Sequence, residues 1–224
     1  MRYNYNNMEN KIYTYKYQHP AVATDCVVFG YDGKNLHVLL IERGIDPFKG
    51  SWALPGGFLK MNETVEECAQ RELQEETNMS NIYLEQFHVF SAVDRDPRER
   101  ILSVSFLALV QKSKFNLIAG DDAAKTEWFE INNLPSLAFD HKEIIELAKN
   151  KLQQILSYKP IAFKLLDKTF IMSELQRLYE LINETEYDRR NFHKKMIATG
   201  LFKNEGICKI PMHGRSPQMY TFNE

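Results

Sequence analysis

The sequence predicts an α/β sandwich domain followed by a smaller domain of short helices and strands. Three observations support this expectation. Strand-like segments stand before and after a glutamate-rich helix, as in an α/β fold. A long helix is then broken at Lys159-Pro160, and the balance of charge changes sign beyond that point. We therefore expect domains over residues 12–157 and 161–224.

Composition sets the outer limits. With 224 residues and 44% hydrophobic content, the chain can bury one good core and a second, smaller one. No apolar run approaches the roughly 18 residues that span a membrane, and MRYNYNNMENK lacks the apolar segment of a signal peptide. We expect a cytoplasmic protein with no membrane contact. Cys26, Cys68 and Cys208 have no metal-binding spacing, which favours free thiols.

The strands of the first domain are expected in two pairs. Residues 21–41 form two strands joined by a turn that contains Asp32-Gly33, a hairpin signal. A second pair includes HVFSAVD and ILSVSFLALV, separated by the charged residues 95–100. EWFEINNLPSL resembles a closing strand and turn, after which Asp140 caps a helix that ends near Ser157.

The glutamate-rich helix begins with a capping box, in which Thr64 is followed three residues later by Glu67. Its far end is expected at Asn78, because asparagine tolerates the left-handed conformation beyond a last helical turn. With about 100 degrees per residue, the apolar side chains form one arc of this helix.

Two glutamates, Glu72 and Glu76, lie inside that apolar arc, with Glu75 at its edge. A carboxylate that faces a core costs several kcal/mol, on the order of 2–7, unless it is paired or binds a metal. Together the carboxylates of these glutamates suit a hard divalent cation such as Mg²⁺ or Mn²⁺. The alternative is an ordinary solvated face, since glutamate-rich helices are common.

The loop before the helix favours the metal interpretation. Gly56 and Gly57 allow the backbone to approach a ligand closely. Arg71 can pair with Glu63 or Glu75 and so hold the carboxylates in place.

These residues resemble the Nudix box of enzymes that cleave nucleoside diphosphates linked to another group. The match runs from Gly57 through Glu63 to Arg71-Glu72-Leu73-Gln74-Glu75-Glu76-Thr77, with Asn78 where the family has glycine. The resemblance implies an α/β/α sandwich. It also implies metal ligands at Glu72, Glu76 and Gly56, a further ligand or helper in water activation at Glu75, and structural roles for Gly57, Glu63 and Arg71.

Arginines outside the box are candidates for ligand binding. Arg95 and Arg98 could clamp substrate phosphates, since guanidinium forks match phosphate oxygens in pairs. The alternative is a charge-rich surface hairpin. Arg43 and Trp52 could also contact a ligand, although Trp52 suits the core equally well.

The C-terminal part is more basic than the rest. Residues 1–158 hold 17 basic against 22 acidic side chains, a net −5, whereas residues 159–224 hold 11 against 8, a net +3. Ser173 with Gln176 predicts a capping box for a helix whose core face carries Leu175, Leu178, Tyr179 and Ile182. Asp188 caps a second helix, RRNFHKKMIAT, which Gly200 stops.

Two short helices followed by the strand-like GICKI and QMYTF are the parts of a winged helix-turn-helix. In the second helix Phe192 and Met196 face inward. The candidate DNA-contacting residues are Arg189, Arg190, Asn191, Lys194 and Lys195 on this helix and Arg215 at the tip of the wing. A small dimerisation or lid domain with a merely solvated basic face is the alternative.

The combination resembles the Nudix-related transcriptional regulators, from about Lys16 onward. The resemblance implies a homodimer that binds double-stranded DNA and senses ADP-ribose or a related nucleotide or sugar metabolite. A second hypothesis is a metal-dependent hydrolase of the ADP-ribose pyrophosphatase type, because the carboxylates that many such regulators lack are present here. The two activities are compatible, and the sequence identifies neither the effector nor the operator.

Overall fold

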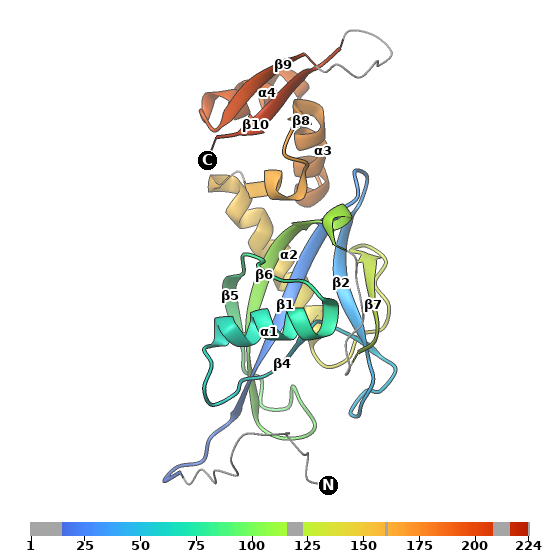
Figure 1. The fold of residues 1–224 in the computed structure, drawn as a ribbon, viewed down its shortest axis with the longest axis vertical. Coiled ribbons are helices and arrows are strands. Elements are labelled where there is room, and N and C mark those ends of the chain that lie inside the picture. The colour runs from blue at the N-terminus through green and yellow to red at the C-terminus, as the bar shows by residue number, and fades with distance from the viewer. Residues whose placement is uncertain (1–14, 116–122, 160, 208–215, 224) are drawn as a thin grey trace.

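The computed structural model describes residues 15–115, 123–159, 161–207 and 216–223. In the ribbon, a sheet-containing first domain and a smaller second domain are connected by one long helix (Figure 1). This arrangement confirms the predicted α/β domain followed by a winged helix domain.

A mixed sheet forms the centre of the first domain. Its described strands are β1 (Ala21–Tyr31), β2 (Leu36–Arg43), β3 (Trp52–Ala53), β4 (Gly56–Phe58), β5 (Glu85–Phe90), β6 (Ile101–Gln111) and β7 (Ala123–Glu130). The main order is β3-β2-β1-β6-β5, with β4 beside β1 and β7 beside β2. Strands β1 and β6 run parallel along their full length, whereas the other pairs are antiparallel.

Both predicted hairpins are present. Strands β1 and β2 pair across the expected turn, where the Asp32 carboxylate accepts the backbone N–H groups of Lys34 and Asn35 at 2.8 and 2.7 Å. Strands β5 and β6 form the second pair. β5 begins earlier than predicted and ends at Phe90, so the SAVD segment lies outside it.

Helices α1 (Val65–Thr77) and α2 (His141–Tyr158) cover opposite faces of the sheet (Figure 1). Cys26 and Val28 of β1 pack in the cluster that contains residues of α1, while Val27 and Phe29 pack in the cluster that contains residues of α2. Alternate residues of a strand point to opposite faces, which explains why β1 is apolar on both sides. The predicted α/β/α sandwich is confirmed.

The second domain has the helices and strands of a winged helix. It contains η2 (Ile161–Leu165), β8 (Phe170–Ile171), α3 (Met172–Asn183), α4 (Arg189–Ala198), β9 (Phe202–Ile207) and β10 (Gln218–Phe222). The strands pair in the order β8-β10-β9. β9 starts several residues before the predicted GICKI segment, and residues 208–215 lie outside the described part.

One predicted helix cap is wrong, and a second is correct in position but lacks the side-chain bond. Helix α3 begins at Met172, and the backbone N–H of Ile171 donates to Glu174 at 2.9 Å, because the chain enters the helix directly from β8. Gln176 instead donates to the carbonyl of Tyr187. Asp140 occupies the N-cap position of α2 without a side-chain cap bond, because its carboxylate is taken by Arg95.

The caps of the other helices are as expected. Thr64 and Glu67 form a reciprocal capping box on α1, and Asn78 beyond it has φ 58°. Asp188 accepts the backbone N–H of Asn191 at 2.9 Å and caps α4. Local signals were sufficient at these sites, because no distant side chain competes for the capping groups.

Helix α2 joins the two domains through one continuous apolar core. The cluster beneath α2 extends from Phe29 of β1 through Ile155 to Leu175 of α3 and Phe192 of α4. Polar contacts reinforce this seam: Gln153 donates to the carbonyl of Ile182 at 2.8 Å, and Lys149 pairs with Glu184 at 2.5 Å. The second domain is therefore anchored on the C-terminal half of α2. A small helix η1 (Lys112–Lys114) follows β6.

Two general expectations can be compared with the structure. Cys26 and Cys68 are free, as predicted, and both are buried, while Cys208 lies outside the described residues. Within the described ranges, the helices are too short or too polar to span a bilayer.

Candidate functional site

Helix α1 presents two carboxylates to the glycine pair of β4. Glu76 is only 8% exposed, and its carboxylate accepts the backbone N–H of Gly56 at 2.9 Å. The Glu72 carboxylate lies so close to Gly57 that a Cβ there would collide with it. Gly56 has φ 158°, and a Cβ on it would collide with the carbonyl of Thr24. Gly56 therefore requires glycine, whereas a side chain at position 57 would displace the Glu72 carboxylate.

Arg71 connects the acidic side chains of this loop and helix. Its guanidinium lies 2.7 Å from Glu63, 2.6 Å from Glu72 and 3.0 Å from Glu75. The hydrogen bond from Arg71 lowers the pKa of Glu63 to about 2. Arg71 thus pairs with both partners that the sequence offered, and it fixes the Glu72 carboxylate as well.

Glu72 and Glu75 differ in environment. Burial raises the pKa of Glu72 against the opposing effect of the Arg71 hydrogen bond, whereas the Glu75 side chain is 53% exposed. A buried carboxylate regains its charge beside a cation. Within the described ranges, no three acidic, histidine or cysteine side chains gather closely enough to form a metal cluster by themselves. The oxygen donors here are two carboxylates and the backbone of the glycine loop.

Arg43 and Arg98, two of the candidate ligand-binding arginines, meet around Phe139. Their guanidinium carbons lie 4.9 and 5.6 Å from the centre of that ring, and Arg98 also lies 5.0 Å from the ring of Phe58, next to Gly57. Burial lowers the pKa of Arg43, and the nearby Arg98 lowers it further. Phe139 has φ 52°, a conformation that is uncommon for an aromatic residue. The structure thus collects positive charge beside the carboxylate site.

Arg95 is placed differently from the other two arginines. Its side chain is 5% exposed, and it forks onto Asp140 at 2.6 and 2.8 Å while reaching Asp25 at 3.2 Å. The Arg95 side chain is therefore buried and does not lie in a charge-rich surface hairpin. Because both aspartates occupy this guanidinium, a role for Arg95 in ligand binding stays a prediction without support from the geometry.

Sequence reasoning missed two residues of this buried network, Asp25 and His141. Asp25 also accepts the hydroxyl of Ser103 and lies 3.5 Å from Nε2 of His141. Nδ1 of His141 accepts the backbone N–H of Leu54 at 2.8 Å, and burial lowers the pKa of this histidine. An aspartate inside the apolar run of β1 was the available signal, since a buried charge needs a partner.

Trp52 packs as a core residue and not as a ligand contact. Its ring is half-buried and packs edge-to-face against Phe129, with centroids 4.6 Å apart.

The basic side chains of α4 lie on three sides of the helix. Phe192 and Met196 are buried, so helical spacing directs Arg190 and Lys194 away from the domain. Asn191 and Lys195 line a cleft beside α2 and α3, and both Arg189 and Arg190 line a groove next to β10. Arg215 lies outside the described residues.

Comparison with known proteins covers both domains. The NUDIX domain model matches residues 19–148, and the NrtR DNA-binding winged helix domain model matches residues 162–222. The chain is 31% identical over 211 residues to the "ADPR responsive transcriptional repressor NtrR" of Acinetobacter baylyi, covering 92% of this chain and 83% of that protein. The chain belongs to the Nudix-related transcriptional regulators.

Other proteins resemble this regulator in whole or in part. Its fold matches the crystal structure of Shewanella oneidensis NrtR complexed with a 27mer DNA at a TM-score of 0.76 and 28% identity, over 90% of this chain and 93% of that one. Its first domain is 47% identical over 130 residues to the ADP-ribose pyrophosphatase of Methanocaldococcus jannaschii, covering 58% of this chain and 73% of that protein. Nudix hydrolases generally use divalent metal ions.

Asn78 is the one position at which this regulator departs from the box. Its φ of 58° is left-handed, and its backbone N–H donates to the carbonyl of Gln74 at 3.1 Å. Asparagine therefore closes α1 in the conformation for which glycine is otherwise preferred.

Proposed function

We propose that this regulator binds double-stranded DNA as a homodimer and that its Nudix domain senses ADP-ribose or a related nucleotide. The observation that carries the proposal is a carboxylate site in the first domain and a basic helix in the second, in a chain whose two domains share an apolar core along α2 and which is similar over both domains to an ADPR-responsive repressor.

The DNA-contacting surface is centred on the outward face of α4. The Asp188 cap and the buried Phe192 and Met196 fix the helix on its domain. Arg190 and Lys194 then extend on the opposite side, where arginine can bind guanine edges and lysine can bind phosphates. Asn191 and Lys195 flank this face on the side of α2.

The effector would engage the arginines beside the carboxylate site. Two guanidinium groups around Phe139 match the charge and the fork geometry of a diphosphate. Asp96 holds Arg98 through bonds of 2.7 and 3.0 Å, which restricts its orientation before a ligand arrives. Arg43 is similarly restrained by its hydrogen bond to the carbonyl of Pro47 at 2.8 Å.

Helix α2 provides a physical connection from effector to DNA. Phe139 directly precedes Asp140 and His141, which attach the start of α2 to β1 and to the loop before Gly56. The 18 residues of α2 end against the DNA-binding domain, roughly 27 Å away at 1.5 Å per residue. A displacement of Phe139 by the ligand would therefore move α4, and the ligand would shift DNA affinity by its preference for one arrangement.

Fluorescence anisotropy tests this proposal. The full chain is titrated onto duplexes tiled from upstream regions of its own genome, with excess nonspecific DNA, with and without ADP-ribose. Selective binding that ADP-ribose changes is the expected result. If the protein binds none of the duplexes selectively, the regulator proposal is overturned. If it binds a duplex selectively but ADP-ribose does not change that binding, the choice of ADP-ribose as effector is overturned.

A second function, metal-dependent hydrolysis, is favoured by the intact carboxylates and by the similarity to an ADP-ribose pyrophosphatase. Glu72, Glu76 and the carbonyl of Gly56 offer hard oxygen donors suited to Mg²⁺ or Mn²⁺. When bound, such a cation would neutralise the diphosphate and lower the pKa of an attacking water.

The residues around this oxygen set have distinct proposed tasks. Arg71 orients Glu72 and Glu75 through bonds of 2.6 and 3.0 Å, and Glu63 holds Arg71. Glu75, the exposed member, is free enough to accept a proton from water at the mouth of the site. A regulator that also hydrolyses its effector would produce a transient signal.

A further inference from the structure

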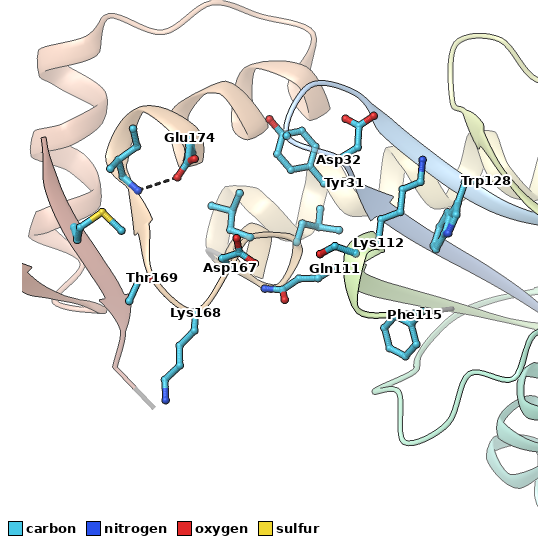
Figure 2. A pocket seen from close by; sticks show the side chains of 16 residues that line it. Tyr31, Asp32, Gln111, Lys112, Phe115, Trp128, Asp167, Lys168, Thr169 and Glu174 are labelled. Atoms are coloured by element: carbon cyan, nitrogen blue, oxygen red, sulfur yellow. Dashed lines mark hydrogen bonds between the residues drawn. The ribbon is translucent and has the colours of Figure 1, made fainter. Parts of the chain in front are cut away.

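A cavity of about 1210 Å³ lies between the two domains, away from the carboxylate site (Figure 2). One wall comes from the ends of β1 and β6 and from β7, and the other from residues 165–171, α3 and β10. Tyr31 at this end of β1 is six residues from Asp25, the partner of Gly56, which corresponds to roughly 20 Å along a strand. The cavity is therefore distinct from the proposed effector site.

Aromatic side chains form much of the wall that the first domain supplies. Trp128, Phe115 and Tyr31 all line the cavity (Figure 2). The indole of Trp128 lies against the backbone of Gly30, where a Cβ would be only 2.8 Å from the ring. This support fixes the indole at the cavity wall and provides a flat apolar surface suited to a planar ring.

Two polar side chains at the end of β6 make no direct polar contact within the described part of the chain. The side-chain oxygen of Gln111 is buried and accepts no hydrogen bond from these residues. Lys112 is half-buried and makes no direct ion pair or hydrogen bond with the described residues, although it lies near enough to Asp32 to lower the pKa of that carboxyl group. The exposed Lys168 on the opposite wall likewise makes no direct ion pair there, and its charge reaches Glu205 only at longer range. A buried acceptor without a donor is costly, and two lysines without direct ion pairs can accept a further anion. A ligand with an N–H donor and an anionic group would satisfy them.

The acidic residues of the cavity are mostly engaged already. Asp32 accepts two backbone N–H groups of its own turn, and Glu174 accepts the N–H of Ile171 (Figure 2). Asp167 remains exposed on the second wall, where it could accept hydrogen bonds from ligand hydroxyl groups.

We propose that this cavity binds a purine mononucleotide with an exocyclic amine. Its base lies against Trp128, its amine donates to Gln111, its ribose faces Asp167, and its phosphate lies between Lys112 and Lys168. Because the two walls belong to different domains, the bound nucleotide restricts their relative orientation and alters the affinity of α4 for DNA. The site does not depend on the proposed effector function.

The chain contains only two tryptophans, Trp52 and Trp128, which makes a specific reporter available. In the Trp52→Phe variant of the full chain, Trp128 is the sole source of indole fluorescence. Titration with AMP, in EDTA and with saturating ADP-ribose, should change its emission saturably. Gln111→Leu and Lys112→Ala should each weaken AMP binding about tenfold, as expected for one lost bond to a charged or buried group.

Lys34→Ala is the matched control, because Lys34 is exposed on the adjacent turn and does not line the cavity. Its AMP affinity should be unchanged. The proposal is overturned if Trp128 shows no saturable change, if ADP-ribose abolishes the change by competition, or if Lys112→Ala binds AMP as tightly as Lys34→Ala does.

Calorimetry of the unmodified chain provides a second measurement in case Trp52→Phe fails to fold. With ADP-ribose and EDTA present, AMP should bind one further site per chain, and Lys112→Ala should weaken it. Absence of AMP binding under these conditions overturns the proposal and leaves the effector site unaffected.

Discussion

Replacing Arg95 by methionine tests whether this arginine serves the fold or the ligand. The side chain is 5% exposed and bonds Asp140 at 2.6 and 2.8 Å and Asp25 at 3.2 Å. Methionine approximates its length without its charge, so two nearly buried carboxylates lose their cation. Removal of one partner from a buried ion pair typically costs about 3–5 kcal/mol. We expect Arg95→Met to lower the stability by about 3 kcal/mol.

Urea unfolding followed by circular dichroism measures this change, and thermal unfolding should show a midpoint roughly 10 °C lower. The added substitution Asp140→Asn should restore part of the loss, because it removes one of the orphaned charges. Arg100→Met is the matched control, since Arg100 is exposed and, among the described residues, its side chain bonds two backbone carbonyls, those of Ser91 and Ala92. Unchanged stability of Arg95→Met together with lost ADP-ribose binding would refute a structural role and restore the ligand interpretation.

Three further outcomes are expected. Glu76→Gln should reduce magnesium-dependent hydrolysis of ADP-ribose by about a hundredfold, because the substitution removes a metal ligand. An assay of released product measures this loss. Arg190→Ala with Lys194→Ala should weaken operator binding, reduce sequence selectivity through the lost arginine, and reduce the slope of log affinity against log salt by about one through the lost lysine. Glu63→Gln should be less stable than the parent at neutral pH, and the difference should vanish toward pH 2. The pKa of Glu63 is lowered from 4.5 to about 2, so its contribution to stability is full above pH 4.5 and declines as the pH falls from 4.5 to about 2.

Controls separate these outcomes from loss of the fold. Glu66→Gln, on the exposed face of α1, should retain hydrolysis; equal losses in Glu66→Gln and Glu76→Gln would contradict the metal assignment. An unaltered salt slope in the double variant of α4 would place the DNA-contacting surface elsewhere. A constant stability difference between Glu63→Gln and the parent from neutral pH to pH 2 would show that the Glu63 charge does not stabilise the fold.

The parts of the structure that the sequence predicted are those governed by near neighbours. Thr64 and Glu67 are three residues apart, and the apolar arc of α1 can be read from spacing alone. The hairpin at Asp32 likewise depends on a turn of a few residues. In each case the interacting residues are separated by no more than one or two helical turns or one hairpin. Contacts from distant parts of the chain therefore do not determine whether the interaction forms.

The errors occur where distant residues compete. Asp140 was expected to cap α2, but Arg95, 45 residues earlier, takes its carboxylate. The parallel pairing of β1 with β6 joins segments 80 residues apart, and it brings Ser103 to the carboxylate of Asp25. Neither contact has a local signature. For the same reason, the sequence indicates Arg43 and Arg98 as separate candidates for ligand binding. Their common contact with Phe139 is visible only in the structure.

Because a helix connects the two domains, a change in its length would alter their distance and relative orientation in fixed steps. Each residue inserted into α2 would lengthen the connection by about 1.5 Å and turn the DNA-binding domain by about 100 degrees. A flexible linker would absorb such a change, whereas α2 continues into the apolar seam at Ile155. Insertions of about seven or eleven residues, close to two or three full turns, would return α4 nearly to its original direction. The length of α2 therefore fixes the direction of α4 relative to the first domain.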